Sequence, residues 1–89
     1  MLKITYDNFF KRQFKTYQKK HYNMENFQTV LKLLANEDVL PAKYKDHSLS
    51  GNWKGYRECH IESDWLLIYK ITQDELILSA TGSHDELFK

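Results

Sequence analysis

Four histidines stand out in this chain of 89 residues, because imidazole is the side chain that exchanges protons near neutral pH. Three of them, His47, His60 and His84, lie in the second half of the chain. That half also contains Asp64, a carboxylate that can orient an imidazole, so the set can supply a general acid and a general base. The alternative interpretation is three unrelated surface or hydrogen-bonded histidines. Residue types alone leave both interpretations open.

Cys59 is a second candidate nucleophile, directly before His60. Adjacent strand residues face opposite sides of a sheet, so the thiol does not easily pair with that imidazole, and Cys59 is expected in the core with Ile61. A single cysteine excludes an internal disulfide and a four-thiolate metal site. The chain has no HExxH motif, no Gly-rich phosphate loop and no close Cys/His pair suited to a metal site, so we expect no metal and no cofactor.

The periodicity of apolar residues predicts which elements must position these side chains. A short strand at 2–6 is followed by a helix over about 8–20 with Asp7 as its N-cap, and by a second helix from the Asn23 cap to about Asn36. The polar segment 42–54 is expected to be a long loop or irregular strand. Three strands then follow with short turns, at about 55–62, 65–72 and 75–81. The fold class is α+β: a small antiparallel sheet with two N-terminal helices packed on it.

Alternation along a strand separates core from site. In 56–62, one face carries Arg57, Cys59 and Ile61, and the other carries Tyr56, Glu58, His60 and Glu62, which is polar and should face water or a ligand. In the last strand Leu76, Leu78, Ala80, Gly82 and His84 share one parity, although a bend at Gly82 would void that count for His84.

Composition indicates one globular domain over 1–89, with 42% hydrophobic residues and no apolar run long enough for a signal peptide or a membrane span, so we expect a cytoplasmic protein. Charge is unevenly distributed: residues 1–20 carry six basic side chains against one acidic one. The basic side chains form two groups. One lies on the predicted first helix and comprises Lys11, Arg12, Lys15 and Lys19; the other lies near the middle of the chain and comprises Lys43, Lys45, Lys54 and Arg57. A polyanionic partner and a solvated helix face both explain them, and charge alone favours the solvated face.

Two stretches of the chain carry a family resemblance. Residues 44–70 read YKDHSLSGNWKGYRECHIESDWLLIYK and residues 81–88 read TGSHDELF. Their order and spacing resemble the YafQ branch of the RelE/ParE toxin superfamily, over about half of the chain. The resemblance implies a compact sheet with two N-terminal helices, and a toxin of a type II toxin–antitoxin pair that cuts translated mRNA in the ribosomal A site without a metal.

The resemblance also implies roles for individual residues. The family's functional histidines fall on His47, His60 and His84, its aspartate on Asp64 and its C-terminal aromatic on Phe88. We expect His84 as general acid, His60 or His47 as base, Asp64 to fix a ring or contact RNA, and Phe88 to stack on a base. Lys45, Lys54 and Arg57 are the expected RNA-binding cations. Expected partners are a cognate antitoxin, in an assembly such as a heterotetramer, and the ribosome with its mRNA, both through the basic first helix.

One departure from the family pattern leaves alternatives open. Many relatives carry an arginine directly before the TG[ST]H motif, where this chain has Ala80. Losing a phosphate-binding donor predicts a slower nuclease, or one that uses a lysine from the segment 43–54. The alternatives are a toxin that binds a target such as DNA gyrase, and a weakly active or inactive member retained for antitoxin binding.

Overall fold

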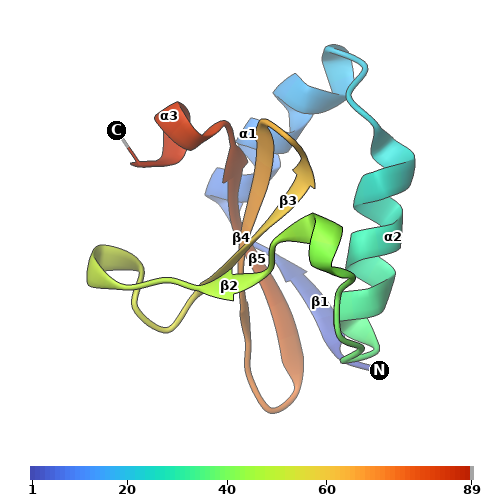
Figure 1. The fold of residues 1–89 in the computed structure, drawn as a ribbon, viewed down its shortest axis with the longest axis vertical. Helices are drawn as coiled ribbons and strands as arrows, with labels where there is room; N and C mark the ends of the chain where they lie inside the picture. Colours follow the sequence, from blue (N-terminus) through green and yellow to red (C-terminus); the bar gives the residue numbers. More distant parts are fainter. Residues whose placement is uncertain (89) are drawn as a thin grey trace.

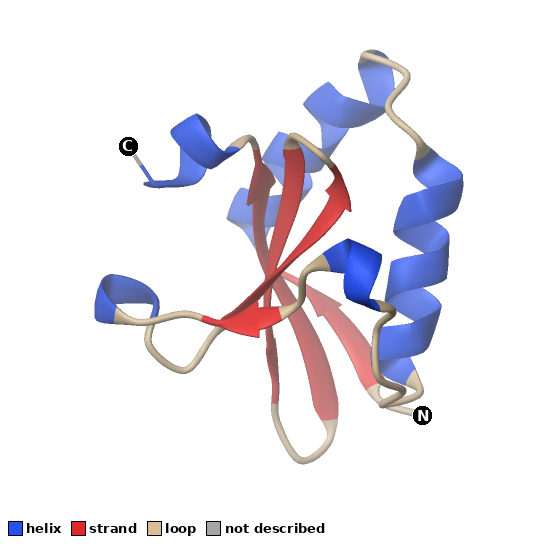
Figure 2. Ribbon diagram, in the orientation of Figure 1, coloured by secondary structure: helices blue, strands red, loops and turns tan. Residues whose placement is uncertain are grey.

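The computed structural model describes residues 1–88. Its helices are α1 (Asn8–Lys19), α2 (Met24–Ala35) and α3 (His84–Phe88), with 3-10 turns η1 (Ala42–Tyr44) and η2 (Gly51–Trp53). Its strands are β1 (Lys3–Tyr6), β2 (His47–Ser48), β3 (Arg57–Glu62), β4 (Trp65–Ile71) and β5 (Glu75–Gly82). Within these described residues the strands form one sheet in the order β1-β5-β4-β3-β2. The predicted α+β class and the two N-terminal helices are confirmed (Figure 2).

The expectation of an antiparallel sheet is wrong at one edge. Strands β2 to β5 pair antiparallel with their neighbours, but β1 pairs parallel with β5, with Ile4 opposite Leu76. The chain leaves β1 through both helices and re-enters the sheet at the far edge, so the last strand of the meander returns beside the first. Local sequence patterns carry no information about that long-range pairing.

Helices α1 and α2 cover one face of the sheet (Figure 1). Aromatic side chains fill the space between these helices and the sheet. Trp65 on β4 is fully buried, and the ring of Tyr17 stacks on it with centroids 5.2 Å apart and an interplanar angle of 3°. Phe14 and Phe27 lie against the same indole. Asn23 caps α2 by accepting a hydrogen bond from the Asn26 amide at 3.1 Å, as predicted, whereas the Asp7 side chain makes no cap hydrogen bond.

Two irregularities in strand pairing change which face later residues occupy. On β5, Tyr69 pairs with Leu78 and Ile68 pairs with Ala80, so Ser79 is an extra residue without a partner. Such a bulge reverses the alternation beyond it. Leu76 and Leu78 therefore face the helices, while Ala80 faces the other way, and the shared parity predicted for the whole strand is wrong. A second shift between His60 and Glu62 moves Glu62 toward α2, where it accepts from the Asn23 amide.

The opposite face of the sheet is partly covered by the segment from β2 to the start of β3 and by α3. Figure 1 shows both on the side of the sheet away from α2. The segment 42–54, expected as loop or irregular strand, contains η1, β2 and η2. Helix α3 was not expected, because five residues carry too little periodicity to signal a helix. This second face holds the candidate site.

Candidate active site

Cross-strand register gathers the histidines on the face opposite the two long helices. One row of paired residues runs across the sheet through His47, Glu58, Ile68 and Ala80. The next row runs through His60, Leu66 and Gly82, and His84 follows Gly82 by two residues. Three segments that are far apart in sequence thus bring their imidazoles to one side of one sheet.

Glu58 is the centre of this arrangement. Its side chain is 5% exposed, and one carboxylate oxygen, Oε1, lies 3.5 Å from His47 Nε2 and 3.4 Å from His60 Nε2. A buried carboxylate needs hydrogen-bond donors or positive charge nearby, because it has lost its water. The Nε2 of His60 can donate to this oxygen, and His47 compensates the carboxylate once its own ring has accepted a proton. In return the carboxylate stabilises the charge that an imidazole acquires when it accepts a proton.

The ring of His47 is fixed by its second nitrogen. Nδ1 lies 2.7 Å from the carbonyl oxygen of Lys45, and a carbonyl only accepts, so Nδ1 carries the hydrogen. In the neutral ring the vacant lone pair is therefore on Nε2, the nitrogen that faces Glu58. Lys45 adopts a left-handed conformation with φ of 50°, which turns its carbonyl back toward the ring.

Asp46 anchors this turn to the sheet. Its Oδ1 accepts hydrogen bonds from the hydroxyl of Tyr69 on β4 and from Nε of Arg57 on β3. Asp46 lies between Lys45 and His47, so tying it to two strands holds both neighbours in place. The hydrogen bond with Asp46 raises the pKa of Arg57, whose guanidinium is thereby committed to this structural pair.

A surface hollow of about 330 Å³ opens beside these groups. Its lining comes from β2 and the loop after it, from β3 and from α3: His47, Leu49, Ser50, Glu58, His84 and Phe88. The rings of His84 and Phe88 lie 5.1 Å apart, one turn of α3 from each other. An imidazole, an aromatic ring and a histidine–carboxylate pair thus surround one cavity.

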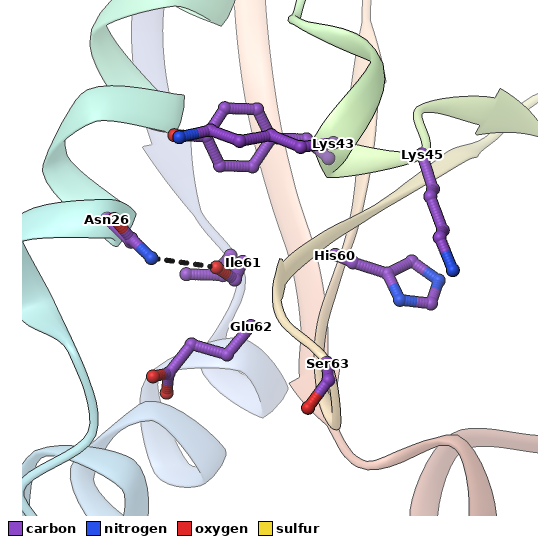
Figure 3. Close-up of a pocket in the computed structure, with 8 residues that line it drawn as sticks. Asn26, Lys43, Lys45, His60, Ile61, Glu62 and Ser63 are labelled. Atoms are coloured by element: carbon purple, nitrogen blue, oxygen red, sulfur yellow. Dashed lines mark hydrogen bonds between the residues drawn. The ribbon is translucent and has the colours of Figure 1, made fainter.

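His60 lines a second hollow, of about 260 Å³, which shares no lining residue with the first (Figure 3). Lys43 and Lys45 contribute to this second hollow, together with Tyr44, Asn26 and the end of β3. Figure 3 shows the Lys45 amino group and the His60 ring directed into the same space. The amino group of Lys45 therefore shares a hollow with His60, which belongs to the histidine–carboxylate cluster.

Other residues predicted for the site lie elsewhere. Asp64 is exposed in the turn between β3 and β4, and among residues 1–88 it forms no hydrogen bond or ion pair with a histidine. The contact with imidazoles that we expected of Asp64 is made by Glu58. Lys54 is exposed beyond η2 and lines neither hollow, and Arg57 lies on the helix face of β3 with Cys59.

Ala80 and Cys59 are both fully buried, on opposite faces of the sheet. Ala80 shares the row of Glu58, so its methyl group occupies the position from which a longer side chain would extend toward the carboxylate. Cys59 belongs to the core, as predicted, and burial raises the pKa of its thiol. Within the described chain no group of three or more His, Cys, Asp or Glu side chains is placed to hold a metal ion. None of its helices is both long and apolar enough to cross a membrane.

Glu58 is the residue that the sequence analysis missed as a functional candidate. Alternation along the strand places Glu58 on the polar face with His60, and this shared face was the sequence signal for a functional role. Its partner His47 is 11 residues earlier, across a loop with no readable period, so the pairing of β2 with β3 was not foreseeable.

The comparison with known proteins identifies the family. The model of the YafQ toxin family, a bacterial toxin of type II toxin–antitoxin systems, matches residues 2–89. The chain belongs to the YafQ toxin family. The mRNA interferase toxin YafQ of Escherichia coli K12 is 45% identical over 86 residues, which cover 96% of this chain and 94% of that protein.

Solved structures agree with this YafQ assignment. The crystal structure of YafQ from E. coli BL21(DE3) superposes with a TM-score of 0.92 at 42% identity and full coverage of both chains. YafQ in the E. coli DinJ–YafQ complex superposes with a TM-score of 0.91 at 43% identity, again over both whole chains. The RelE-like fold expected from the resemblance is thereby confirmed.

Proposed function

We propose that this YafQ-family chain is an mRNA interferase, a ribosome-dependent endoribonuclease that cuts translated mRNA by metal-independent acid–base catalysis. The observation that carries the proposal is the hollow that His84 lines together with the His47–Glu58 pair. The name mRNA interferase printed for the 45% identical E. coli relative supports the same activity. A target-binding toxin has no need of proton-transfer groups arranged around a cavity.

The base in this proposal is His47. The RNA 2′-hydroxyl gives its proton to His47 Nε2, because Nδ1 is committed to the Lys45 carbonyl. The 2′-oxygen then bonds to the adjacent phosphorus, while Glu58 stabilises the imidazolium that has formed. His60 Nε2 lies 3.4 Å from the same carboxylate oxygen and adds a second imidazole beside it.

The acid is His84, which lines the same hollow from α3. As the bond from phosphorus to the 5′-oxygen breaks, the imidazolium of His84 gives that oxygen a proton. The products are a 2′,3′-cyclic phosphate and a 5′-hydroxyl, and the histidines end in exchanged protonation states. Phe88, one helical turn from His84, is placed to stack on a base next to the cut.

The developing negative charge on the phosphate needs a cation. Ala80 supplies none, Arg57 is bound to Asp46, and Lys54 lies outside both hollows. Lys45 lines the hollow that adjoins the cluster and points into the same space as His60 (Figure 3). We assign to Lys45 the role of stabilising the charge on the phosphate, because the Lys43 amino group lies over the Tyr44 ring and points away from His60 (Figure 3). A lysine offers a single flexible charge in place of a planar fork, so cleavage is expected to be slower than with an arginine.

The proposed partners are a cognate antitoxin and the translating ribosome. The E. coli DinJ–YafQ complex supports an antitoxin partner, with a heterotetramer as the proposed assembly. Helix α1 presents an exposed basic face that suits an acidic antitoxin segment or ribosomal RNA, formed by Lys11, Arg12, Lys15 and Lys19. Asp64, exposed on the turn before Trp65, is proposed to contact RNA and not to orient a histidine.

The test is primer extension on a defined mRNA in a translating extract, comparing the wild type with His84→Ala. The matched control is His21→Asn, which removes an exposed imidazole in the turn after α1, and asparagine tolerates the φ of 60° found there. We expect discrete cuts in the mRNA that form only when ribosomes are present. These cuts should persist with the His21→Asn protein and disappear with the His84→Ala protein.

Two outcomes would contradict the proposal. Intact mRNA with growth still inhibited would favour a toxin that binds a target such as DNA gyrase. Intact mRNA with no effect on growth would favour an inactive member retained for antitoxin binding, with Ala80 as the cause.

A further inference from the structure

Helix α3 carries the proposed acid and the stacking ring, yet little in its own sequence holds it. It has five residues, none of them buried. An isolated helix of one turn and a half does not form in water, because too few hydrogen bonds offset the ordering of its backbone. Its position must therefore come from contacts with the rest of the molecule.

Leu87 lies near Gly82 on β5, and Glu86 makes a hydrogen bond to a distant helix. The hydroxyl of Tyr17, on α1, donates a hydrogen bond to Glu86 Oε1 at 2.5 Å across 69 positions of sequence. The same carboxylate oxygen accepts the Ser83 amide at 2.8 Å, and the Glu86 amide donates to Ser83 Oγ at 3.2 Å. Among residues 1–88 this is the one side-chain hydrogen bond that joins α3 to a distant element. Glu86 thus both caps α3 and ties it to α1.

The anchor on α1 is rigid. Tyr17 is 5% exposed and stacks flat on the buried indole of Trp65, so its hydroxyl has little freedom to move. Gly82 makes room on the other side: a Cβ at that position would lie 3.1 Å from Glu86 Oε1. Burial and the neighbouring carboxylate raise the pKa of Tyr17, and the hydrogen bond from Tyr17 lowers the pKa of Glu86. At neutral pH the phenol therefore donates and the carboxylate accepts.

We propose that Tyr17 and Glu86 are positioning residues, whose hydrogen bond fixes α3 and thereby sets His84 and Phe88 over the hollow. This inference rests on the proposed nuclease function for its catalytic consequence, while the placement of α3 is independent of it. Tyr17 and Glu86 act through His84 and Phe88, because neither lines the hollow.

The test compares Tyr17→Phe with Tyr22→Phe. Tyr22 also packs edge-on against Trp65, and its hydroxyl makes no side-chain hydrogen bond within the described residues, so the control removes the same atom without the link. Two quantities are measured: exchange of the Leu87 amide hydrogen, which is bonded to the Ser83 carbonyl, and the single-turnover rate of mRNA cleavage on ribosomes. A further pair, Glu86→Gln and Glu86→Ala, retains and removes the acceptor.

We expect Tyr17→Phe to speed Leu87 exchange and to slow cleavage by about tenfold to a hundredfold, as for a small misplacement of a reacting group. Tyr22→Phe should change neither, and Glu86→Gln should retain more activity than Glu86→Ala. Unchanged Leu87 exchange in Tyr17→Phe would overturn the inference, and so would faster exchange with wild-type cleavage. If the wild type cuts no RNA, the nuclease proposal is wrong, but the exchange rate of the Leu87 amide still shows whether the Tyr17–Glu86 hydrogen bond positions α3. The failure of one proposal can therefore be distinguished from the failure of the other.

Discussion

Replacing Glu58 by glutamine removes one negative charge from between two imidazoles and leaves the shape of the side chain almost unchanged. In the wild type the carboxylate oxygen is 3.5 Å from His47 Nε2. Unit charges at that distance attract by about 5 kcal/mol at an effective dielectric constant of about 20, and by about 1 kcal/mol in bulk water. His47 is 51% exposed while Glu58 is 5% exposed, so the pair lies between these limits.

This attraction exists only after His47 has taken the proton, so its loss raises the barrier of the chemical step. A loss of about 1–5 kcal/mol corresponds to cleavage that is slower by about fivefold to about five-thousandfold. Binding of ribosomes should change little, because Glu58 is buried. The assay is single-turnover cleavage of ribosome-bound mRNA, with kcat and KM determined separately.

The control for this variant is Glu25→Gln. Glu25 is exposed in the first turn of α2, and within the described residues it lines neither hollow and forms no ion pair. Melting temperatures of both variants show whether the fold is intact. A folded Glu58→Gln protein that cleaves at the wild-type rate would refute the role given to the carboxylate.

Three further predictions follow from the burial and charge of other residues. Ala80→Arg should raise the cleavage rate, because it adds a cation in the row of Glu58, and it should lower Tm, because arginine overfills a fully buried position. The control is Ala80→Met, and a folded Ala80→Arg protein that cleaves no faster than this control would contradict the argument that a cation is missing. Cys59 should resist iodoacetamide in the native protein at pH 8, since burial raises the pKa of its thiol, and should react after unfolding; rapid native labelling would contradict its place in the core. Reversing the charges of Lys11, Arg12 and Lys15 on α1 should weaken ribosome binding and make the affinity less dependent on salt concentration. An unchanged dependence of affinity on salt would exclude this face from RNA contact.

Much of the fold follows from local patterns in the sequence. The spacing of Phe10, Phe14 and Tyr17 specifies a helix with one apolar face, and Asn23 specifies where the next helix begins. Alternation in β3 places His60 away from Cys59. These features depend on residues within a few positions of one another, so a single sequence determines them.

The site depends on contacts between segments that are distant in sequence. The unpaired Ser79 puts Ala80 on the face of Glu58, and strand parity does not reveal an extra residue whose position is set by the partner strand. The pairing of β2 with β3 joins His47 to Glu58, and Tyr17 holds a terminal helix that has too few residues to form alone. The sequence by itself determined α1, α2, the strands β1 and β3 to β5, and the identity of the three histidines. Only the tertiary structure decided that a buried glutamate holds two of them, because contacts across the sheet have no signature in local periodicity.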